Sequence, residues 1–245
     1  MGSASSSRRI YIGTEANQYL AEQTLIYSIR KHLSDPSIEI IPLTQTQRRV
    51  GGTRFGFVRF TLPQAMGYQG KALYLDADQL ALTDLAPLFD LLPEDKAIAC
   101  VYEAEGLYNG KPHVHTWHTS VMLLDCAQLP WQPDELFALV VPNKQEPLPG
   151  QIRYRNFMEL QWFEQDRIAK LPPSWNHFNI VTPETNIVHF SHVRSQPWKN
   201  PRHELTDFWL GYLREAIEAG YLRRRDVVSA VAWGHVHPWT LKAIA

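Results

Sequence analysis

Short apolar runs separated by polar turns dominate the first part of the chain. Ile10–Ile12, Ile38–Leu43 and Ala72–Leu75 are short, hydrophobic and flanked by turn residues, which predicts strands. Between the first two, apolar and small residues recur at helical spacing over Leu20–Leu33 until Asp35-Pro36, which predicts an amphipathic helix. A strand, a helix and a strand in this order favour a parallel pair, so the pattern indicates an α/β fold.

Alternating strands and helices continue toward the C-terminus, which favours one domain over residues 8–245 with a helical segment over 204–245. Residues 1–7 are small and polar and read as a disordered leader. Polar and aromatic residues over 103–118 predict a loop. The other predicted elements are strands over 97–102, 119–124 and 186–190 and helices over 55–66, 84–91, 134–140, 157–168 and 204–219.

The charge balance argues against a nucleic-acid partner, because 24 Lys and Arg stand against 25 Asp and Glu, a formal net charge of −1. No apolar run approaches the roughly 18 residues of a membrane span. Cys100 and Cys126 lie in or just after apolar runs, as reduced thiols of a cytoplasmic protein would. Arg223–Arg225 near Trp233 and Trp239 leaves two alternatives, a solvated helix start or peripheral contact with the inner face of a membrane.

Two carboxylates follow the predicted strand Ala72–Leu75. Asp76 and Asp78 stand at its carboxyl end, where open α/β sheets bind their ligands. Carboxylates at i and i+2 can converge on one hard cation, which oxygen ligands suit. The alternative is that both are turn or cap residues that face water. His113, His115 and His118 suggest zinc less strongly, because no Cys or Asp completes the cluster locally.

Arg59 stands among apolar residues of the predicted helix 55–66, and a buried arginine requires a partner, so we predict a nearby carboxylate. The polar stretch Thr44–Arg54 is either solvated surface or a contact for an anionic ligand. No G-x-G-x-x-G motif follows the first strand, and the phosphate-loop lysine motif is absent from the sequence. These absences argue against the usual dinucleotide and phosphate-loop sites.

A series of motifs, in order along the chain, resembles glycosyltransferase family 8, which includes glycogenin and bacterial lipopolysaccharide galactosyltransferases. An isolated Asp-x-Asp would be weak support, whereas the shared order and spacing make the resemblance specific. The resembling segments are Phe57–Pro63, Lys71–Asp78, Trp117–Asp125, Leu171–Asn176, and His189-Phe190 with Pro197-Trp198.

The resemblance implies a GT-A fold, with a mostly parallel central sheet and a Rossmann-like nucleotide-binding half. It implies transfer of a hexose from a UDP-sugar to a glycan, lipid-linked or protein acceptor, mostly with retention, and a divalent cation, Mn²⁺ or Mg²⁺. Asp76, Asp78 and His189 match the metal ligands, and Asp76, Asp78 and Arg59 the catalytic set. The metal would stabilise charge on the departing UDP. The residues that match cofactor-binding positions are Thr14, Glu15, Tyr19, Arg59, Asp76, Ala77, Arg194 and Gln196.

The C-terminal motif departs from the family pattern H-x-x-G-x-x-K-P-W. Here the spacing is one residue longer, the glycine is missing, and Gln196 stands where the lysine is expected. Arg194 or Lys199 is the candidate substitute for that cation, and His192 competes with His189 as a metal ligand. Upstream, His118 replaces an asparagine common in the family, which bears on sugar recognition.

Two other functions fit the same residues. A metal-dependent phosphoester hydrolase would use the carboxylates and histidines to activate water. A non-catalytic protein of the same fold would bind a nucleotide-sugar or glycan, consistent with the loss of the lysine.

For a retaining transferase, Glu159, Gln161 and Asp125 are only nearby candidates for a nucleophile. Front-face transfer, in which the leaving phosphate helps to deprotonate the acceptor, does not require the second carboxylate of a double displacement.

Overall fold

The computed structural model describes residues 7–44, 50, 55–108 and 111–244, without the side chains of residues 104–108 and 111–115. Residues 1–6 of the predicted leader 1–7 and most of the polar stretch 44–54 lie outside these residues. The chain divides into two compact units that interleave along the sequence. Met1–Gly13, Pro36–Asp76 and Ala86–Pro173 form the first unit, and Thr14–Asp35, Ala77–Leu85 and Ser174–Ala245 form the second. One domain over residues 8–245 remains a prediction.

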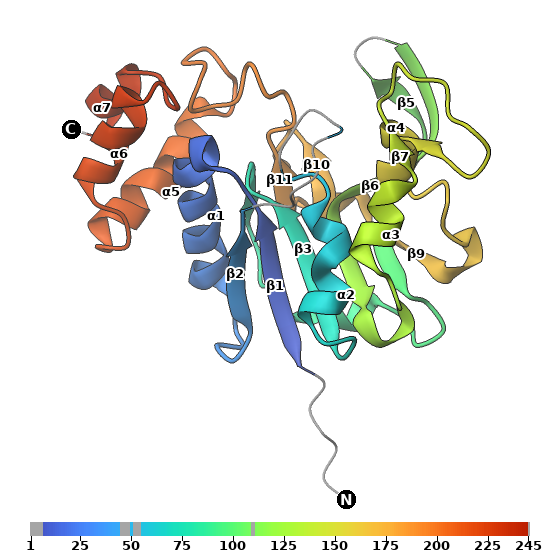
Figure 1. The fold of residues 1–245 in the computed structure, drawn as a ribbon. Helices are drawn as coiled ribbons and strands as arrows, with labels where there is room; N and C mark the ends of the chain where they lie inside the picture. The colour runs from blue at the N-terminus through green and yellow to red at the C-terminus, as the bar shows by residue number, and fades with distance from the viewer. Residues whose placement is uncertain (1–6, 45–49, 51–54, 109–110, 245) are drawn as a thin grey trace, which may run out of the picture. The chain divides into compact units, whose positions relative to one another are not determined.

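A six-stranded sheet with the order β2-β1-β3-β6-β5-β9 is the centre of the first unit (Figure 1). β1 is parallel to β2 and β3, and β5 is parallel to β9, whereas β6 is antiparallel to both of its neighbours. The parallel pair predicted from the first two apolar runs is therefore confirmed. The strands are β1 (Arg8–Gly13), β2 (Glu39–Leu43), β3 (Lys71–Asp76), β5 (Ile98–Tyr108), β6 (Lys111–Asp125) and β9 (Ile168–Leu171).

An aromatic core packs against this sheet. Phe60 contacts Phe157 with ring centroids 4.6 Å apart, and Trp162 stacks on Phe157 at 5.0 Å. The predicted helix 55–66 is a 3₁₀ turn followed by a short α-helix with Pro63 in its first turn, where proline costs no hydrogen bond. The remaining elements of this unit are η2 (Val58–Thr61), α2 (Leu62–Ala65), η3 (Ala86–Leu91), η4 (Cys126–Gln128), α3 (Pro133–Ala138), β7 (Val140–Val141), β8 (Ile152–Arg153), α4 (Tyr154–Met158) and η5 (Gln165–Arg167).

Two predicted elements of the first unit are wrong. The helix predicted over 157–168 ends early, because Leu160 has a φ of 55° and side chains take the carbonyls that a helix would use. Trp162 donates to the carbonyl of Phe157 and Gln165 to that of Leu160. Within the loop predicted over 103–118, residues 103–108 and 111–118 belong instead to β5 and β6, whose ladder continues past a β-bulge after Cys100.

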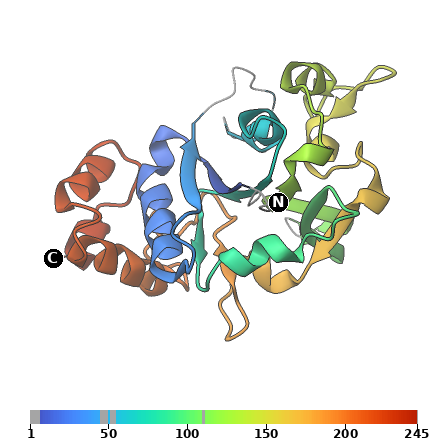
Figure 2. The ribbon, with the colours of Figure 1, turned by 90° about the horizontal axis from the view of Figure 1, so that it is seen from below.

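In the described residues, the second unit contains a three-stranded sheet with the order β10-β11-β4, the longer helices α1, α5 and α6, and the short helix α7. α1 packs on β4, α5 and α6, and the two views show α5 to α7 gathered beside α1 (Figures 1 and 2). The helices predicted over 20–33 and 204–219 are confirmed as α1 and α5. The elements are η1 (Ala16–Gln18), α1 (Tyr19–His32), β4 (Gln79–Ala81), η6 (Pro173–Asn176), β10 (His177–Phe178), β11 (Ile187–His189), α5 (Thr206–Glu218), α6 (Arg224–Ala232) and α7 (Trp239–Ala243).

Within the described ranges, no helix has the length and apolar character that crossing a membrane requires.

Candidate active site

Asp76 is the last residue of β3, and its carboxylate is held by two donors. The Tyr74 hydroxyl, two residues earlier on the same face of the strand, donates to Oδ1 at 2.6 Å. Arg59 pairs with the same oxygen at 2.9 Å, and both side chains of this ion pair are largely buried, at 5% and 14% exposure. The carboxylate partner predicted for Arg59 is therefore confirmed as Asp76.

The other two nitrogens of Arg59 also donate hydrogen bonds, as expected for a buried guanidinium. Nε donates to the carbonyl of Gly56 at 3.0 Å and Nη1 to the hydroxyl of Thr119 at 2.9 Å. Its guanidinium carbon lies 4.5 Å from the centre of the Tyr74 ring, a cation–π contact. Arg59 thus links the helical segment before β3 to β6 and fixes the carboxylate at the end of β3.

Gly13 makes room for this arrangement. It is the last residue of β1 and lies opposite Asp76 in the parallel register. A Cβ atom at position 13 would lie 1.9 Å from the hydroxyl oxygen of Tyr74 and 2.7 Å from its Cζ atom. A side chain at this position would therefore displace the ring that holds Asp76.

We expect Gly13→Ala to lower the free energy of unfolding by about 1–3 kcal/mol, because it overpacks the buried Tyr74. Urea denaturation measures this change. Gly211→Ala is the matched control, since a Cβ there meets no atom within 4 Å and the residue lies inside α5. The control should gain about 0.5–1 kcal/mol from helix propensity. A Gly13→Ala protein as stable as the wild type would contradict the assigned packing.

Asp78 lies in the turn between β3 and β4, and its two carboxylate oxygens have different surroundings. Oδ2 accepts a hydrogen bond from Nε2 of Gln196 at 2.8 Å. Oδ1 lies 3.2 Å from Nε2 of His189 and, in the described part of the chain, has no hydrogen-bond donor in good geometry. The backbone carbonyl of Asp78 accepts from the amide of Phe190 at 2.9 Å, which holds the turn against the end of β11.

His189 ends β11, and its ring is oriented by Asn176. Nδ1 lies 3.2 Å from the side-chain oxygen of Asn176, which can only accept, so this nitrogen carries the proton. Nε2 then presents its lone pair to Oδ1 of Asp78. A cation between these two electron-rich atoms, which lie 3.2 Å apart, would stabilise both.

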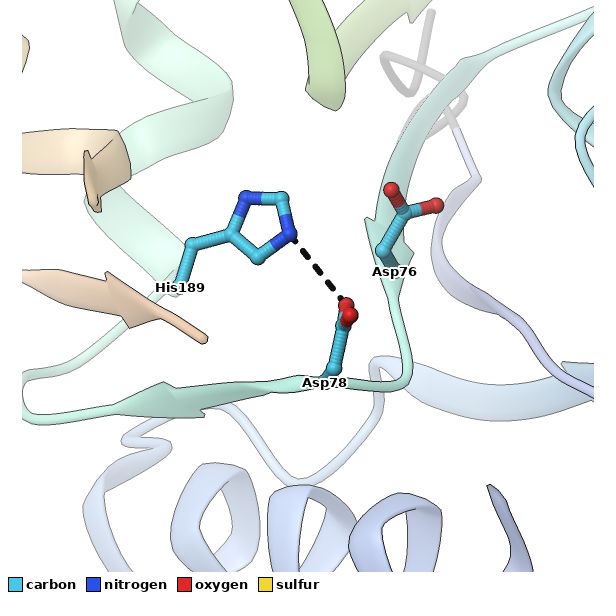
Figure 3. Close-up of side chains that lie close together, drawn as sticks. All are labelled: Asp76, Asp78 and His189. Carbon is cyan, nitrogen blue, oxygen red and sulfur yellow. Dashed lines mark ion pairs between the residues drawn. The ribbon is translucent and has the colours of Figure 1, made fainter. Parts of the chain in front are cut away.

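The three side chains predicted as metal ligands come together. One ligand atom each from Asp76, Asp78 and His189 lies within 4.8 Å of the others. Figure 3 shows the His189 ring and the Asp78 carboxylate pointing toward each other, with Asp76 at the end of its strand. Two carboxylates and an imidazole whose second nitrogen is hydrogen-bonded are a suitable donor set for Mn²⁺ and similar divalent cations.

The first loop contributes residues of different accessibility. Thr14 is fully buried, Glu15 is partly exposed, and Tyr19 at the start of α1 is 44% exposed. Ala77, between the two aspartates, is fully buried. The side chains of Glu15 and Tyr19 are therefore accessible to a ligand, whereas Thr14 and Ala77 are closed to solvent.

The residues of the altered motif after His189 differ in burial and in their contacts with Asp78. Gln196 is fully buried against Asp78, and Lys199 is partly buried and donates to Oε1 of Gln196 at 2.8 Å. Arg194 and His192 are exposed, and His192 is not part of the three-ligand group. Of the two candidate cations, Lys199 is the one connected to Asp78.

His118 pairs with a carboxylate instead of completing a histidine cluster. Its Nε2 atom lies 2.8 Å from Oε2 of Glu103, across the ladder between β5 and β6. The side chains of His113 and His115 lie outside the described residues, so the zinc alternative remains open.

Sequence reasoning missed the residues that support the ligands. The sequence indicates Tyr74 only as part of a buried strand, and Asn176 only as part of a segment that resembles the family. Gly13 and Thr119 received no role. A tyrosine two residues before Asp76 was a usable indication, because it lies on the same face of the strand. The other contacts depend on strand register and on segments distant in sequence.

The mixed sheet, with a carboxylate pair at the end of β3, has the arrangement of the GT-A fold. The fold is similar to that of the galactosyltransferase LgtC in complex with donor and acceptor sugar analogues, with a TM-score of 0.60, 12% identity, and coverage of 84% of this chain and 95% of that one. It is also similar to the glycosyltransferase GlyE of Streptococcus pneumoniae TIGR4, with a TM-score of 0.64, 16% identity, and coverage of 85% and 60%. The bifunctional glycosyltransferase WbbM gives a TM-score of 0.63 at 12% identity, and this chain spans half of its length (87% and 50% coverage).

The chain belongs to glycosyltransferase family 8, whose sequence model matches residues 9–201. A curated relative, Protein CDI of Arabidopsis thaliana, is 28% identical over 231 residues, which cover 84% of this chain and 86% of the relative. These matches establish glycosyl transfer as the class of reaction and agree with the resemblance inferred from the motifs.

Proposed function

We propose that the protein transfers a hexose from a UDP-sugar to a glycan, lipid-linked or protein acceptor, with retention of configuration and with Mn²⁺, or Mg²⁺, at the active site. The main support is the convergence of Asp76, Asp78 and His189 in a chain of glycosyltransferase family 8. Neither a phosphoester hydrolase nor a non-catalytic binding protein is favoured by a specific contact among the described residues.

In this proposal Asp76, Asp78 and His189 hold the cation. When bound, the cation would neutralise charge that develops on the departing diphosphate. Arg59 and Tyr74 hold the Asp76 carboxylate, and Asn176 fixes the His189 ring with Nε2 available to the cation. These contacts orient the donor set before any ligand arrives, which limits the reorganisation needed during the reaction.

The nucleotide would contact the first loop, including Glu15 and Tyr19, and Lys199 would supply the positive charge near the diphosphate. Burial lowers the pKa of Lys199, and the nearby Asp78 and Glu15 oppose that effect. Arg194 is the less favoured cation because it is exposed.

The contacts of the carboxylates do not support a double displacement. Asp125 pairs with Lys71 in the register of β3 and β6, so it lies at the opposite end of β3 from Asp76. Glu159 is engaged with Arg155 at 2.7 Å and Gln161 at 3.1 Å. Front-face transfer does not require the second carboxylate of a double displacement, so it agrees better with these positions.

We further propose a cytoplasmic protein that contacts the inner face of a membrane through α6. Cys100 and Cys126 are free and buried, and burial raises the pKa of Cys126 to about 12, which keeps it a neutral thiol. Trp233 directly after α6 is 77% exposed and follows the exposed arginines 223–225. Arginines at the start of a helix and an exposed tryptophan at its end are residue types that interfacial helices use on anionic membrane surfaces.

Removal of the metal tests the proposed function. We expect calorimetry to show UDP binding in the presence of Mn²⁺, loss of that binding in excess EDTA, and recovery when Mn²⁺ is restored, because the diphosphate binds through the cation. UDP-glucose, UDP-galactose and the N-acetyl sugars would then be compared as donors by Mn²⁺-dependent release of UDP. Undiminished UDP binding in EDTA would contradict the proposal, binding without release of UDP would favour the binding protein, and cleavage of simple phosphoesters would favour the hydrolase.

A further inference from the structure

We propose that Gln196 and Lys199 are positioning residues for Asp78. Gln196 fixes one oxygen of the carboxylate and leaves the other for the cation, and Lys199 fixes the orientation of the Gln196 amide. The inference rests on the proposed function in one respect, namely that Asp78 is a metal ligand. It assigns a new role to the segment in which the family motif is altered.

Both the nitrogen and the oxygen of the Gln196 side-chain amide form hydrogen bonds within the protein. Its side chain is fully buried, and Nε2 donates to Oδ2 of Asp78 at 2.8 Å and to the carbonyl of Phe190 at 3.1 Å. An amide nitrogen has two N–H groups, so both are used. The Phe190 amide in turn donates to the backbone carbonyl of Asp78, which ties the same two segments together a second time.

Lys199 determines which way this amide faces. Its ammonium donates to Oε1 of Gln196 at 2.8 Å and to the carbonyl of Val193 at 3.0 Å. An ammonium group only donates and a carboxylate only accepts. If the amide were flipped, its oxygen would face the Asp78 carboxylate and its N–H groups would face the ammonium, so both contacts would be repulsive. Lys199 and Asp78 together therefore select the observed orientation.

The consequence lies at the other carboxylate oxygen. With Oδ2 occupied by Gln196, Oδ1 of Asp78 faces Nε2 of His189 at 3.2 Å. It is buried and has no hydrogen-bond donor in good geometry among the described side chains and backbone. Oδ1 of Asp78 is therefore already directed toward the position of a cation that binds Nε2 of His189. Supporting residues of this kind typically contribute 10- to 100-fold to metal affinity.

The test is the affinity of the purified full chain for Mn²⁺ alone, measured from the electron paramagnetic resonance signal of free Mn²⁺. We expect Gln196→Met to weaken binding by about 10-fold or more. Lys199→Met, at a partly exposed position that opens no core cavity, should weaken it by a smaller factor, and Lys199→Arg should retain most of the affinity. Because Lys199 acts through Gln196, Lys199→Met should cause no further loss in the Gln196→Met background.

Whether Lys199→Met weakens or tightens Mn²⁺ binding distinguishes a positioning role of Lys199 from a purely electrostatic effect of its charge. Removal of a nearby positive charge would by itself tighten Mn²⁺ binding, so tighter binding by Lys199→Met overturns the role of Lys199. Wild-type affinity in a folded Gln196→Met protein overturns the role of Gln196. If Gln196→Met fails to fold, as judged by its thermal transition, the two Lys199 variants decide. A wild-type protein that binds no Mn²⁺ would instead refute the proposed function.

Discussion

Asp78→Asn should abolish Mn²⁺ binding and reduce glycosyl transfer by more than about 100-fold, since even residues that only support a metal ligand contribute 10- to 100-fold to affinity or activity. The change removes the charge of a buried ligand and replaces Oδ1, the oxygen that faces His189, with a donor. The new amide can donate to Nε2 of His189 and still accept from Gln196, because both atoms lie within 3.2 Å of the carboxylate in the wild type. The folded protein should therefore keep its stability while losing the cation.

Calorimetry with Mn²⁺ and UDP, kcat/KM with the best donor, and a thermal melt would be measured on the same preparation. Asp125→Asn is the matched control, because Asp125 pairs with Lys71 at the other end of β3. The control should keep Mn²⁺ affinity and turnover. Asp76→Asn does not isolate the loss of a metal ligand, because it also removes the partner of buried Arg59. If Asp78→Asn combined with Asp76→Asn left UDP binding unchanged, the transferase mechanism proposed for this site would be wrong.

The elements with a local cause were predictable from the sequence. β1, β2 and β3 are short apolar runs flanked by turn residues, and α1 carries its buried residues at helical spacing, so local length, flanks and spacing indicate each element. The failures have distant causes. Leu160 interrupts a helical pattern because Trp162 stacks back on Phe157, and the sequence near Leu160 does not indicate that contact. The continued pairing of β5 with β6 depends on a register shift at a bulge, which hydrophobic alternation does not predict.

The residues of the candidate site likewise divide into those that the local sequence indicates and those whose roles depend on distant contacts. Asp76 and Asp78 are neighbours in sequence, so their pairing is visible before any fold is known. His189 could be named only through the resemblance to a family, because a lone histidine at the end of a strand carries no indication of its partner. Asn176, Gln196 and Tyr74 act through hydrogen bonds to the three ligands, and each of these bonds depends on the exact placement of a side chain. Composition and periodicity give no information at that level.

Arg59→Met should lower the free energy of unfolding by about 3–5 kcal/mol, because removal of one partner leaves an uncompensated charge in a buried ion pair. Asp76 would keep the hydrogen bond from Tyr74 but lose its cation. Urea denaturation gives the value, and Arg155→Met is the control. Arg155 pairs with Glu159 at a more exposed position, with 46% exposure, so its loss should cost at most about 1 kcal/mol.

The combination of Arg59→Met with Asp76→Asn shows whether this cost belongs to the ion pair. If it does, the double variant should be more stable than the sum of the two single losses predicts, because a neutral amide beside Tyr74 needs no cation. Arg59→Lys should recover little, since a single ammonium group cannot reach Gly56, Thr119 and Asp76 together as the guanidinium does. Additive losses in the double variant would mean that Arg59 stabilises the fold through its contacts with Gly56, Thr119 and the Tyr74 ring, and that Asp76 is held mainly by Tyr74.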